Sequence, residues 1–467
     1  MRTLSIIILF FSSSFLFSQQ LVNSDLFGLT TETTFIFTNV RDSDFISKVK
    51  KISPKILRFP GSNFYHFGGV GYGLDIDEID EWHRAGFPKR ARGLLRNSKQ
   101  RGHKHDYIED FIVLAKKINA RVIITANIIT AKDDETVNIL KKLKSNGIEV
   151  IGVEMGAELS NQSYNHKVNK DNYIVWSKKC AKKIKEFYPD MKITVVAAPL
   201  MNNPLNRHSL WNRALAKETF YDGIIVHNYV KVTTGEDRYG KMITESKEAD
   251  SKKIAFDIYK KRVLKFFSTG FIEKIQQYNL VFDNKPIWIT EWNLQYSKIT
   301  GNTLFQGLFS VHYFLDLASE PELRKVELTT FHNLAGRDYG GSIFRIFQGV
   351  LEEQVTYYPM QMLSNVFEDN SLIITKKVIS NECFQYDIMD DNSILKYSFI
   401  INWSGNDRKI KFDKTLLNSE IDQFCGDDLY SLADNEEDLI HFSSELKYNV
   451  NELLLKPYSL TLIKVKH

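Results

Sequence analysis

The chain has 467 residues, of which 43% are hydrophobic and 25% charged, and its formal net charge at pH 7 is +4. This composition is that of a globular protein and excludes long disordered tracts. The net charge is small for the length, which argues against nucleic acid as a partner. Because the chain is too long for one ordinary core, we expect a large domain and a smaller one.

The first residues have the pattern of a secretory signal peptide. Arg2 supplies a positive charge, and an apolar run extends from Leu4 to Phe17 before Gln19. This run is too short and too rich in serine for a membrane span, so residues 1–19 are predicted to be a cleaved signal peptide. The protein is therefore expected to be secreted or periplasmic, with no membrane span.

Three cysteines cannot all pair within one chain. Cys180 lies in a helical pattern and is expected to be a buried apolar residue. Cys383 and Cys425 both lie in the C-terminal part and could form a disulfide, and the sequence leaves this pairing open. The chain has no CxxC motif and no close His/Cys cluster, so neither a metal nor another cofactor is predicted.

Apolar strands alternate with amphipathic helices eight times between residues 26 and 367. The strands are expected at 26–29, 56–63 (with its loop), 121–128, 150–158, 192–199, 222–229, 287–291 and 326–332. The helices are expected at 42–52, 107–119, 134–146, 172–188, 208–220, 252–278, 303–318 and 357–367. This alternation indicates an α/β fold, a (β/α)8 TIM barrel over residues 20–370 rather than a doubly wound sheet.

Short alternating runs separated by turns replace this pattern from about residue 372. They lie at 373–378, 395–402, 409–412 and 453–465. Such runs predict a C-terminal antiparallel β-sandwich domain over residues 371–467. The sequence leaves open that the first strand or two of this sandwich come from residues near the mature N-terminus.

Two of the predicted barrel strands end on a glutamate. The apolar run that begins at Pro286 ends on Glu291, and the run that begins at Val150 ends on Glu158. A charge at the end of a buried strand needs a partner or a function. Because TIM-barrel active sites lie at the C-terminal ends of the strands, Glu158 and Glu291 are predicted to be the catalytic pair. Glu154 is the alternative on strand four, and we favour Glu158 because it lies at the end of that strand.

Arg58 is a charge inside an apolar strand, directly before Phe59-Pro60-Gly61. It is either a solvent-facing arginine or a guanidinium in the barrel interior that keeps a catalytic carboxylate ionised. The strand followed by Pro-Gly favours the interior position.

A long segment without clear periodicity follows, at residues 68–106. Between Arg84 and Lys104 it holds eight basic residues and no acidic one. A solvated loop is the ordinary explanation of such a charge run. At a barrel mouth, the same charges would attract an anionic substrate such as a uronic-acid or sulfated polysaccharide, and the sequence leaves both open.

Four strand-end motifs resemble those of clan A glycoside hydrolases. Within this clan they are most similar to the motifs of families 39, 51, 79 and 30. They are LRFPG at 57–61, VEMGAE at 153–158, VHNY at 226–229 and ITEWN at 289–293, and the helix at 357–363 and the KPYSL run at 456–460 look similar as well. The resemblance implies a retaining mechanism with Glu158 as acid/base and Glu291 as nucleophile. It also implies that His227 and Tyr229 orient the nucleophile or contact the sugar, and we place Arg58, Asn127 and Trp292 with them as substrate-binding residues.

One position departs from the pattern of the clan. The residue before the acid/base is usually an asparagine that binds the sugar 2-hydroxyl, and here it is Ala157. Either the substrate lacks a free 2-hydroxyl, or Asn127 or Asn161 takes over the contact, or the activity is weak.

The sequence therefore predicts an exported retaining glycoside hydrolase that acts on a plant or algal polysaccharide or its oligosaccharides, neutral or anionic. The alternative is a catalytically impaired barrel that only binds carbohydrate. A polysaccharide lyase is disfavoured because it would need a Tyr/His pair in place of two glutamates. The sugar, the linkage, endo or exo action and the oligomeric state do not follow from the sequence.

Overall fold

The computed structural model describes most of the chain between residues 20 and 466. The described residues are 20–32, 34–61, 65–68, 71–74, 81, 84, 107–131, 134–234, 249, 251–295, 297–337, 340–416, 419–433, 439–445 and 450–466. The predicted signal peptide and, apart from Arg84, the basic residues up to Lys104 lie outside them. In the described part of the chain, no helix has the length and hydropathy that a membrane span requires.

Eight parallel strands close into a barrel, and they follow one another around it in sequence order. They are β2 (Gly28–Thr30), β3 (Ile56–Phe59), β6 (Arg121–Thr125), β7 (Val150–Met155), β8 (Lys192–Val196), β9 (Gly223–Val230), β10 (Ile287–Leu294) and β11 (Val326–Phe331). All eight predicted strands are confirmed, and the (β/α)8 prediction is correct.

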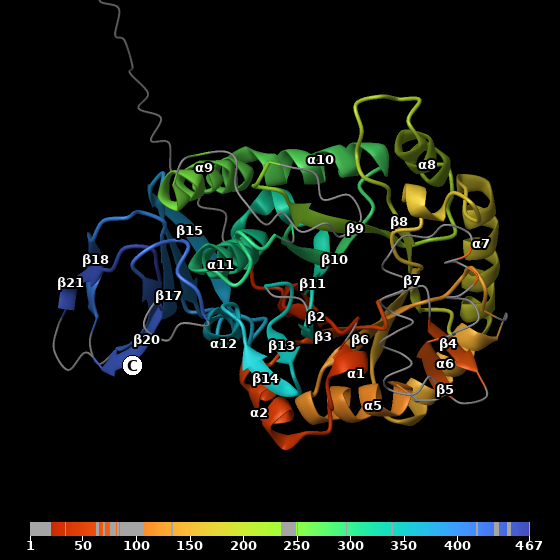
Figure 1. The fold of residues 1–467 in the computed structure, drawn as a ribbon, viewed down its shortest axis with the longest axis horizontal. Helices are drawn as coiled ribbons and strands as arrows, with labels where there is room; N and C mark the ends of the chain where they lie inside the picture. The colour runs from red at the N-terminus through yellow and green to blue at the C-terminus, as the bar shows by residue number, and fades with distance from the viewer. Residues whose placement is uncertain are drawn as a thin grey trace, which may run out of the picture.

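Helices surround the barrel, as Figure 1 shows. They are α1 (Thr34–Phe37), α2 (Ser43–Ile52), α5 (Tyr107–Ile118), α6 (Glu135–Ser145), α7 (Lys170–Phe187), α8 (Arg207–Leu215), α9 (Lys252–Lys265), α10 (Phe271–Val281), α11 (Leu304–Ser319) and α12 (Tyr357–Ser364), with short 3-10 turns η1 (Ser24–Leu26), η2 (Gln162–Tyr164) and η4 (Pro321–Leu323). The segment predicted to be mainly helical, at 252–278, comprises two helices, α9 and α10, joined by a π-helical turn, η3 (Phe266–Gly270). Two small sheets were not predicted: the hairpin β4 (Tyr65–Gly68) and β5 (Gly71–Leu74), and the sheet β12 (Ala335–Gly336), β13 (Phe344–Phe347) and β14 (Val350–Glu353).

Apolar side chains fill the barrel interior below the functional residues. Trp288 packs there against Ile56, Ile123 and Leu328. The indole needs the glycine opposite it, because a Cβ on Gly152 would lie 2.6 Å from Trp288 Cη2. The interior is thus a packed core rather than a pore, and polar groups above this floor can reach solvent only through the mouth.

A bulge in β10 decides which side chains of this strand face the interior. Ile289 pairs with Val226 and Glu291 pairs with His227, so Thr290 is an extra residue in the ladder. Trp288 and Glu291 therefore lie on the same face although they are three residues apart. Without the bulge, the period of two would turn Glu291 away from the interior.

The C-terminal domain is antiparallel. Its large sheet has the order β1-β15-β16-β17-β22-β19-β20, and β18 pairs with β21 in a second sheet. The strands are β1 (Gln20–Leu21), β15 (Ile373–Ser380), β16 (Cys383–Met389), β17 (Leu395–Asn402), β18 (Arg408–Leu416), β19 (Glu420–Gly426), β20 (Leu439–Glu445), β21 (Val450–Leu455) and β22 (Ser459–Lys464). Ile410 and Leu455 pack against Ile400, Ile421 and Ile463 of the large sheet, which gives the domain a sandwich core.

The sandwich differs from the sequence prediction in one run, and all three cysteines are free thiols. The run at 453–465 was predicted as one strand, but it crosses from β21 to β22 and so belongs to both sheets. Cys383 and Cys425 are both buried free thiols, so no disulfide joins them, and Cys180 is half-buried rather than fully buried.

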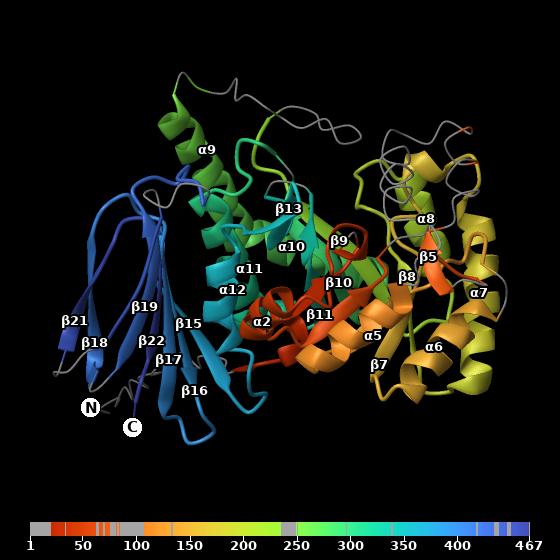
Figure 2. The ribbon, with the colours of Figure 1, turned by 60° about the horizontal axis from the view of Figure 1, so that its bottom comes forward.

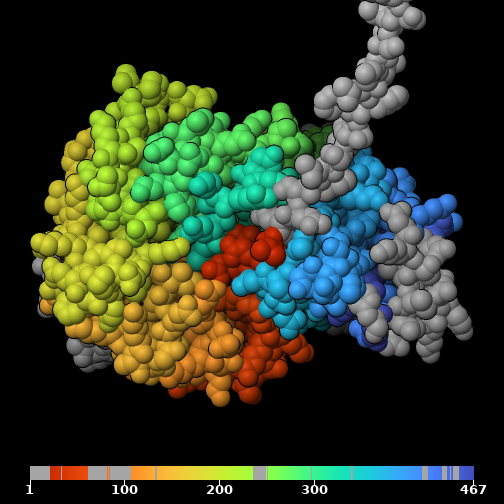
Figure 3. Space-filling view, turned by 180° about the vertical axis from the view of Figure 1, so that it is seen from behind, coloured from red at the N-terminus to blue at the C-terminus, as the bar shows by residue number. Residues whose placement is uncertain are grey.

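The two domains share a large interface along α11, whose sixteen residues are all buried. Trp403 donates a hydrogen bond to His312 Nδ1 at 3.1 Å, and the Tyr386 hydroxyl donates one to Asp316 at 2.6 Å. Strand β1 pairs with β15, which confirms that the sandwich takes a strand from the N-terminal region. Figure 2 shows the sandwich lying beside the barrel, and Figure 3 shows red residues of the N-terminal region at the surface between the orange and the blue parts of the chain.

Candidate active site

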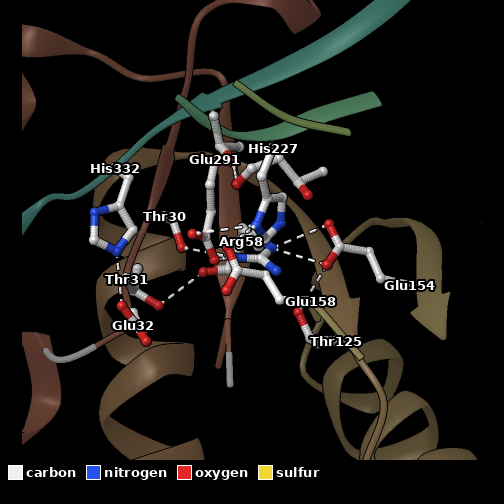
Figure 4. Close-up of polar contacts among 12 residues, drawn as sticks. Thr30, Thr31, Glu32, Arg58, Thr125, Glu154, Glu158, His227, Glu291 and His332 are labelled. Atoms are coloured by element: carbon white, nitrogen blue, oxygen red, sulfur yellow. Dashed lines mark hydrogen bonds and ion pairs between the residues drawn. The ribbon is translucent and has the colours of Figure 1, made fainter. Parts of the chain in front are cut away.

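Polar residues gather at the C-terminal ends of the barrel strands (Figure 4). Arg58 comes from β3, Glu154 from β7, His227 from β9 and Glu291 from β10, and Glu158 follows β7. Parallel strands bring their carboxyl ends to one edge, so residues that are far apart in the sequence meet there.

Arg58 lies at the bottom of this group and is fully buried. Its Nε lies 2.8 Å from Glu154 Oε2, and its Nη1 lies 2.8 Å from Glu291 Oε1. Thr125 completes the setting by donating a hydrogen bond to Glu154 Oε2 at 3.0 Å. The prediction of an interior guanidinium is confirmed, and Glu154 is the residue that orients it.

Gly61 allows the chain to turn directly over this guanidinium. Its φ is +75°, and a Cβ there would lie 3.1 Å from Arg58 Nη1. Any side chain at this position would therefore disturb both the turn and the arginine.

Glu291 is a buried carboxylate with several partners. Besides Arg58, the Tyr229 hydroxyl donates a hydrogen bond to Glu291 Oε2 at 2.7 Å, and His227 Nδ1 lies 3.4 Å from the same oxygen. Burial alone would raise the pKa of Glu291, but His227, Arg58, His332 and the Tyr229 hydrogen bond outweigh it and hold the pKa well below its usual value. Glu291 is therefore ionised at neutral pH, as a nucleophile must be.

Glu158 reaches the same space from the loop after β7. The chain turns there through Gly156 at φ 82° and Glu158 at φ 51°. His227 Nδ1 lies 3.1 Å from Glu158 Oε1, and Asn161 Nδ2 donates to Glu158 Oε2 at 2.9 Å. The side chain of Glu158 is 37% exposed and that of Glu291 only 9%, so Glu158 is the carboxylate that faces the opening.

His227 stands between the two carboxylates. Burial favours the neutral ring, but Glu291 and Glu158 outweigh it and raise the pKa of His227. Nδ1 is the nitrogen that faces both carboxylates, so it carries a proton. In the described part of the chain, the buried Nε2 atom of His227 has no hydrogen-bond partner.

The separation of the two carboxylates restricts their chemistry. One oxygen of each glutamate and a ring nitrogen of His227 all lie within 4.8 Å of one another. Carboxyl groups about 5–5.5 Å apart suit double displacement at an anomeric centre, whereas a mechanism with water between them needs about 6.5–9.5 Å. The same three atoms have the spacing of metal ligands, but Arg58 already neutralises Glu291.

The structure places two other predicted substrate-binding residues, Asn127 and Trp292, less favourably for contact with a sugar. Asn127 is buried in the turn after β6, where its side-chain oxygen accepts hydrogen bonds from the amides of Ile129 and Thr130. The prediction for Trp292 is wrong. Its side chain is fully buried outside the barrel, with its ring stacked on Tyr313 of α11 at 3.9 Å, because the bulge at Thr290 turns it away from the interior.

Sequence reasoning missed an acid–histidine pair beside Glu291. His332 Nε2 lies 2.7 Å from Glu32 Oε2, and the His332 ring packs edge-on to Tyr229 with centroids 5.9 Å apart. Both residues follow barrel strands, β2 and β11. A polar residue at the end of such a strand is the signal that could have identified them.

Comparison with solved structures shows the same architecture in carbohydrate-active enzymes. The chain is similar to a GH51 arabinofuranosidase from Xanthomonas axonopodis pv. citri, with a TM-score of 0.66 and 13% identity over 96% of this chain and 98% of that chain. It is similar to a family 44 xyloglucanase from Paenibacillus polymyxa, with a TM-score of 0.60 and 11% identity over the same shares of the two chains.

A third similar structure is a 4-O-α-L-rhamnosyl-β-D-glucuronidase from Fusarium oxysporum 12S. Its TM-score is 0.58, with 12% identity over 96% of this chain and 97% of that chain. No protein-family model matches the chain, and neither does any curated protein. At these identities the similarity establishes the fold, which is the barrel and β-sandwich architecture that these solved structures share.

Proposed function

We propose that the protein is a retaining glycoside hydrolase in which Glu291 is the nucleophile and Glu158 the acid/base. The observation that carries this proposal is the approach of the two carboxylates to within 4.8 Å at the mouth of the barrel. Their different settings assign the roles. Glu291 is deep, paired and ionised, whereas Glu158 faces the opening, where a leaving group departs.

The reaction has two steps. A Glu291 oxygen bonds to the anomeric carbon as the glycosidic bond breaks, and Glu158 gives its proton to the departing oxygen. Glu158 then takes a proton from water, and the water oxygen displaces Glu291 from the anomeric carbon with restoration of its configuration. Arg58 and Tyr229 fix the Glu291 carboxylate throughout, so little reorganisation accompanies the change in its charge.

The proposed substrate is a plant or algal polysaccharide or its oligosaccharides. The architecture shared with an arabinofuranosidase, a xyloglucanase and a glucuronidase supports this class, and the third of these is named for a uronic-acid substrate. The basic residues between Arg84 and Lys104 favour an anionic glycan. The N-terminal signal pattern supports export, and N-terminal sequencing of the exported protein tests it.

Ala157 favours a second candidate, a carbohydrate-binding barrel with impaired turnover. Nothing at this position can donate a side-chain hydrogen bond to the sugar 2-hydroxyl. Asn161 lies on the same loop with its Nδ2 at 2.9 Å from Glu158, so it is the side chain that can take over this contact. Under this candidate, glycans bind but no new reducing ends form.

The test is incubation with a panel of neutral, uronic and sulfated glycans, followed by assay of new reducing ends. We expect cleavage of at least one glycan and, by proton NMR, a first product that keeps the anomeric configuration. Glu291→Gln and Glu158→Gln should each lower kcat by about 10²–10⁴-fold or more. Glu149→Gln is the matched control because the Glu149 side chain is 69% exposed. This residue directly precedes β7, at the end of the strand opposite the active site.

Four outcomes would contradict the proposal. Cleavage that survives both substitutions would remove the assigned pair, and an inverted first product would remove the double displacement. Binding to the panel without turnover would favour the impaired barrel, while an unsaturated ring in the product would indicate a lyase.

A further inference from the structure

A pocket of about 440 Å³ lies outside the catalytic site, between the last barrel helix and the sandwich. Helix α12 forms one wall, and β19, β20 and β22 form the other. Figure 1 shows α12 at the boundary of the two domains, next to the sandwich strands. None of the lining residues belongs to the strand ends that carry Glu158 and Glu291.

An aromatic surface forms part of the lining. Tyr358 is 37% exposed, whereas its neighbour Tyr357 is buried on the other side of α12. The Tyr358 ring packs against the His441 ring with centroids 4.7 Å apart. Burial lowers the pKa of His441 more than Asp422 raises it, so this ring is neutral at neutral pH. Two uncharged rings side by side offer a face with weak polarity.

The charges of the pocket are paired with one another. Asp422 Oδ2 lies 2.9 Å from Lys464 Nζ, and the Ser443 hydroxyl donates to Asp422 Oδ1. Glu420 Oε1 lies 2.7 Å from Lys466 Nζ, which places its partner on the chain beyond the pocket. Since these acids and lysines neutralise one another, the pocket has no excess of positive charge with which to hold a phosphate, a sulfate or a uronate.

The remaining polar groups are suited to hydroxyls. Gln361 on α12 and Asn365 directly after it line the pocket with amides, and Ser443 and Ser444 line it with hydroxyls from β20. Asn365 Nδ2 donates to carbonyls of α12 and the Ser443 hydroxyl donates to Asp422, so these two residues offer acceptor oxygens to a ligand. Amides and hydroxyls both donate and accept hydrogen bonds. Polar groups opposite an aromatic face, in a pocket of this volume, match a ring that has one apolar face and a rim of hydroxyls.

We propose that this pocket is a second carbohydrate-binding site that holds a neutral glycosyl unit of the polysaccharide away from the catalytic centre. Only the kind of ligand rests on the proposed function, since the pocket geometry is independent of Glu158 and Glu291. Such a site tethers a long chain near the barrel and raises the local concentration of cleavable bonds.

The experiment measures retention of the full chain in native gels that contain soluble arabinan, xyloglucan or mixed-linkage β-glucan, with polygalacturonate as the charged probe. The protein carries Glu158→Gln and Glu291→Gln, so that the glycan is not consumed. Tyr358→Ala should weaken retention by a neutral glycan about tenfold, and Tyr358→Phe, which keeps the ring, should restore it. Phe187→Ala is the matched control, because Phe187 is a 47% exposed ring on α7, outside the pocket.

A second variant guards against unfolding. Gln361→Ala removes one amide of the pocket and should also weaken retention, while the midpoint of urea unfolding stays at the value of the parent. In the active protein, neither Tyr358→Ala nor Gln361→Ala should change kcat/KM for a small aryl glycoside, but both should raise KM for the polymer.

The outcomes separate this inference from the proposed function. Retention that Tyr358→Ala and Gln361→Ala leave unchanged, or that Phe187→Ala weakens equally, overturns the second site even if the protein hydrolyses the glycan. Stronger retention by polygalacturonate than by the neutral glycans, dependent on Tyr358, overturns its neutral specificity. Tyr358-dependent retention in a protein whose native form cleaves nothing supports the site and contradicts the proposed function.

Discussion

Arg58 ties the proposed nucleophile, Glu291, to a second carboxylate, Glu154, which is fully buried. Its Nη1 lies 2.8 Å from Glu291 Oε1, while its Nε lies 2.8 Å from Glu154 Oε2. The guanidinium has two separate edges, so it can hold two carboxylates in fixed directions at once. The orientation of Glu291 therefore depends on Glu154, which acts on it through Arg58 and is fully buried.

Arg58→Lys should weaken the control that this site exerts on the ionisation of Glu291. A lysine ammonium is a point charge on a flexible chain and cannot serve both carboxylates in the same geometry. The pKa of Glu291 will then rise toward its ordinary value, so the acidic limb of the kcat/KM profile should move to higher pH by about one unit. An unchanged acidic limb would show that Arg58 does not set this pKa.

Arg58→Lys should also change how the free energy of unfolding depends on pH. Because the pKa of Glu291 is lowered in the folded protein, its ionised form stabilises the fold above the pKa of an unfolded glutamate, about 4.3. This contribution to stability is lost as the pH falls toward the pKa that Glu291 has in the folded protein. The difference in free energy of unfolding between the parent and Arg58→Lys should thus be largest above about pH 5 and shrink at lower pH.

Glu154→Gln should destabilise the protein strongly. It removes the carboxylate that accepts from Arg58 Nε and Thr125 in a fully buried setting. Breaking a buried ion pair by removing one partner costs about 3–5 kcal/mol. Urea unfolding measures this loss, and the exposed control Glu149→Gln should change the free energy of unfolding by less than about 1 kcal/mol. Equal stability of the two variants would mean that the buried network contributes little.

His227 should govern the loss of stability at alkaline pH. Its pKa is raised in the folded protein, so the imidazolium persists above the ordinary histidine pKa of about 6.5. Its stabilising contribution is fully present below that pH and is lost as the pH rises through the folded pKa. His227→Asn should abolish this alkaline loss of stability, whereas the exposed control His166→Asn should leave the dependence of stability on pH unchanged. A loss of stability that persists in His227→Asn would assign it to another group.

The basic segment makes a separate prediction about substrate charge. Replacement of Arg90, Arg92 and Arg96 by Gln should raise KM for a uronic or sulfated glycan about tenfold and leave KM for a neutral glycan nearly unchanged. Added salt should narrow this difference, because exposed charges are screened. Lys178, Lys179 and Lys182 on α7 form the matched control triple. An equal effect on both glycans would remove the role of the segment in charge selection.

The sequence predicted the barrel well because its signals are local and repeated. Each strand is an apolar run, and each helix has its own amphipathic period. Strand and helix then follow one another in the same order eight times along the chain. Glu158 and Glu291 were predicted for a related reason. A carboxylate at the end of a buried strand conflicts with its neighbours, and that conflict is visible in the sequence.

The errors have a different physical origin, since they depend on pairing between distant segments. The bulge at Thr290 exists only in the register of β10 against β9, and it turns Trp292 outward. The switch from β21 to β22 depends on which sheet each half of the run joins. The orienting role of Glu154 becomes visible only when β3 and β7 place it beside Arg58.

Strand β1 gives the molecule an unusual order of assembly. The Val22 amide donates to the Leu372 carbonyl, and Gln20 pairs with Ile374, so the beginning of the chain completes a sheet whose other strands are made last. During synthesis the first segment must wait, without its partner, until nearly the whole polypeptide has emerged. In a ribosome-stalled or C-terminally truncated chain, the backbone groups of β1 would have no strand to pair with, and they could pair with another chain instead. Productive folding therefore depends on synthesis of the strands from β15 onward.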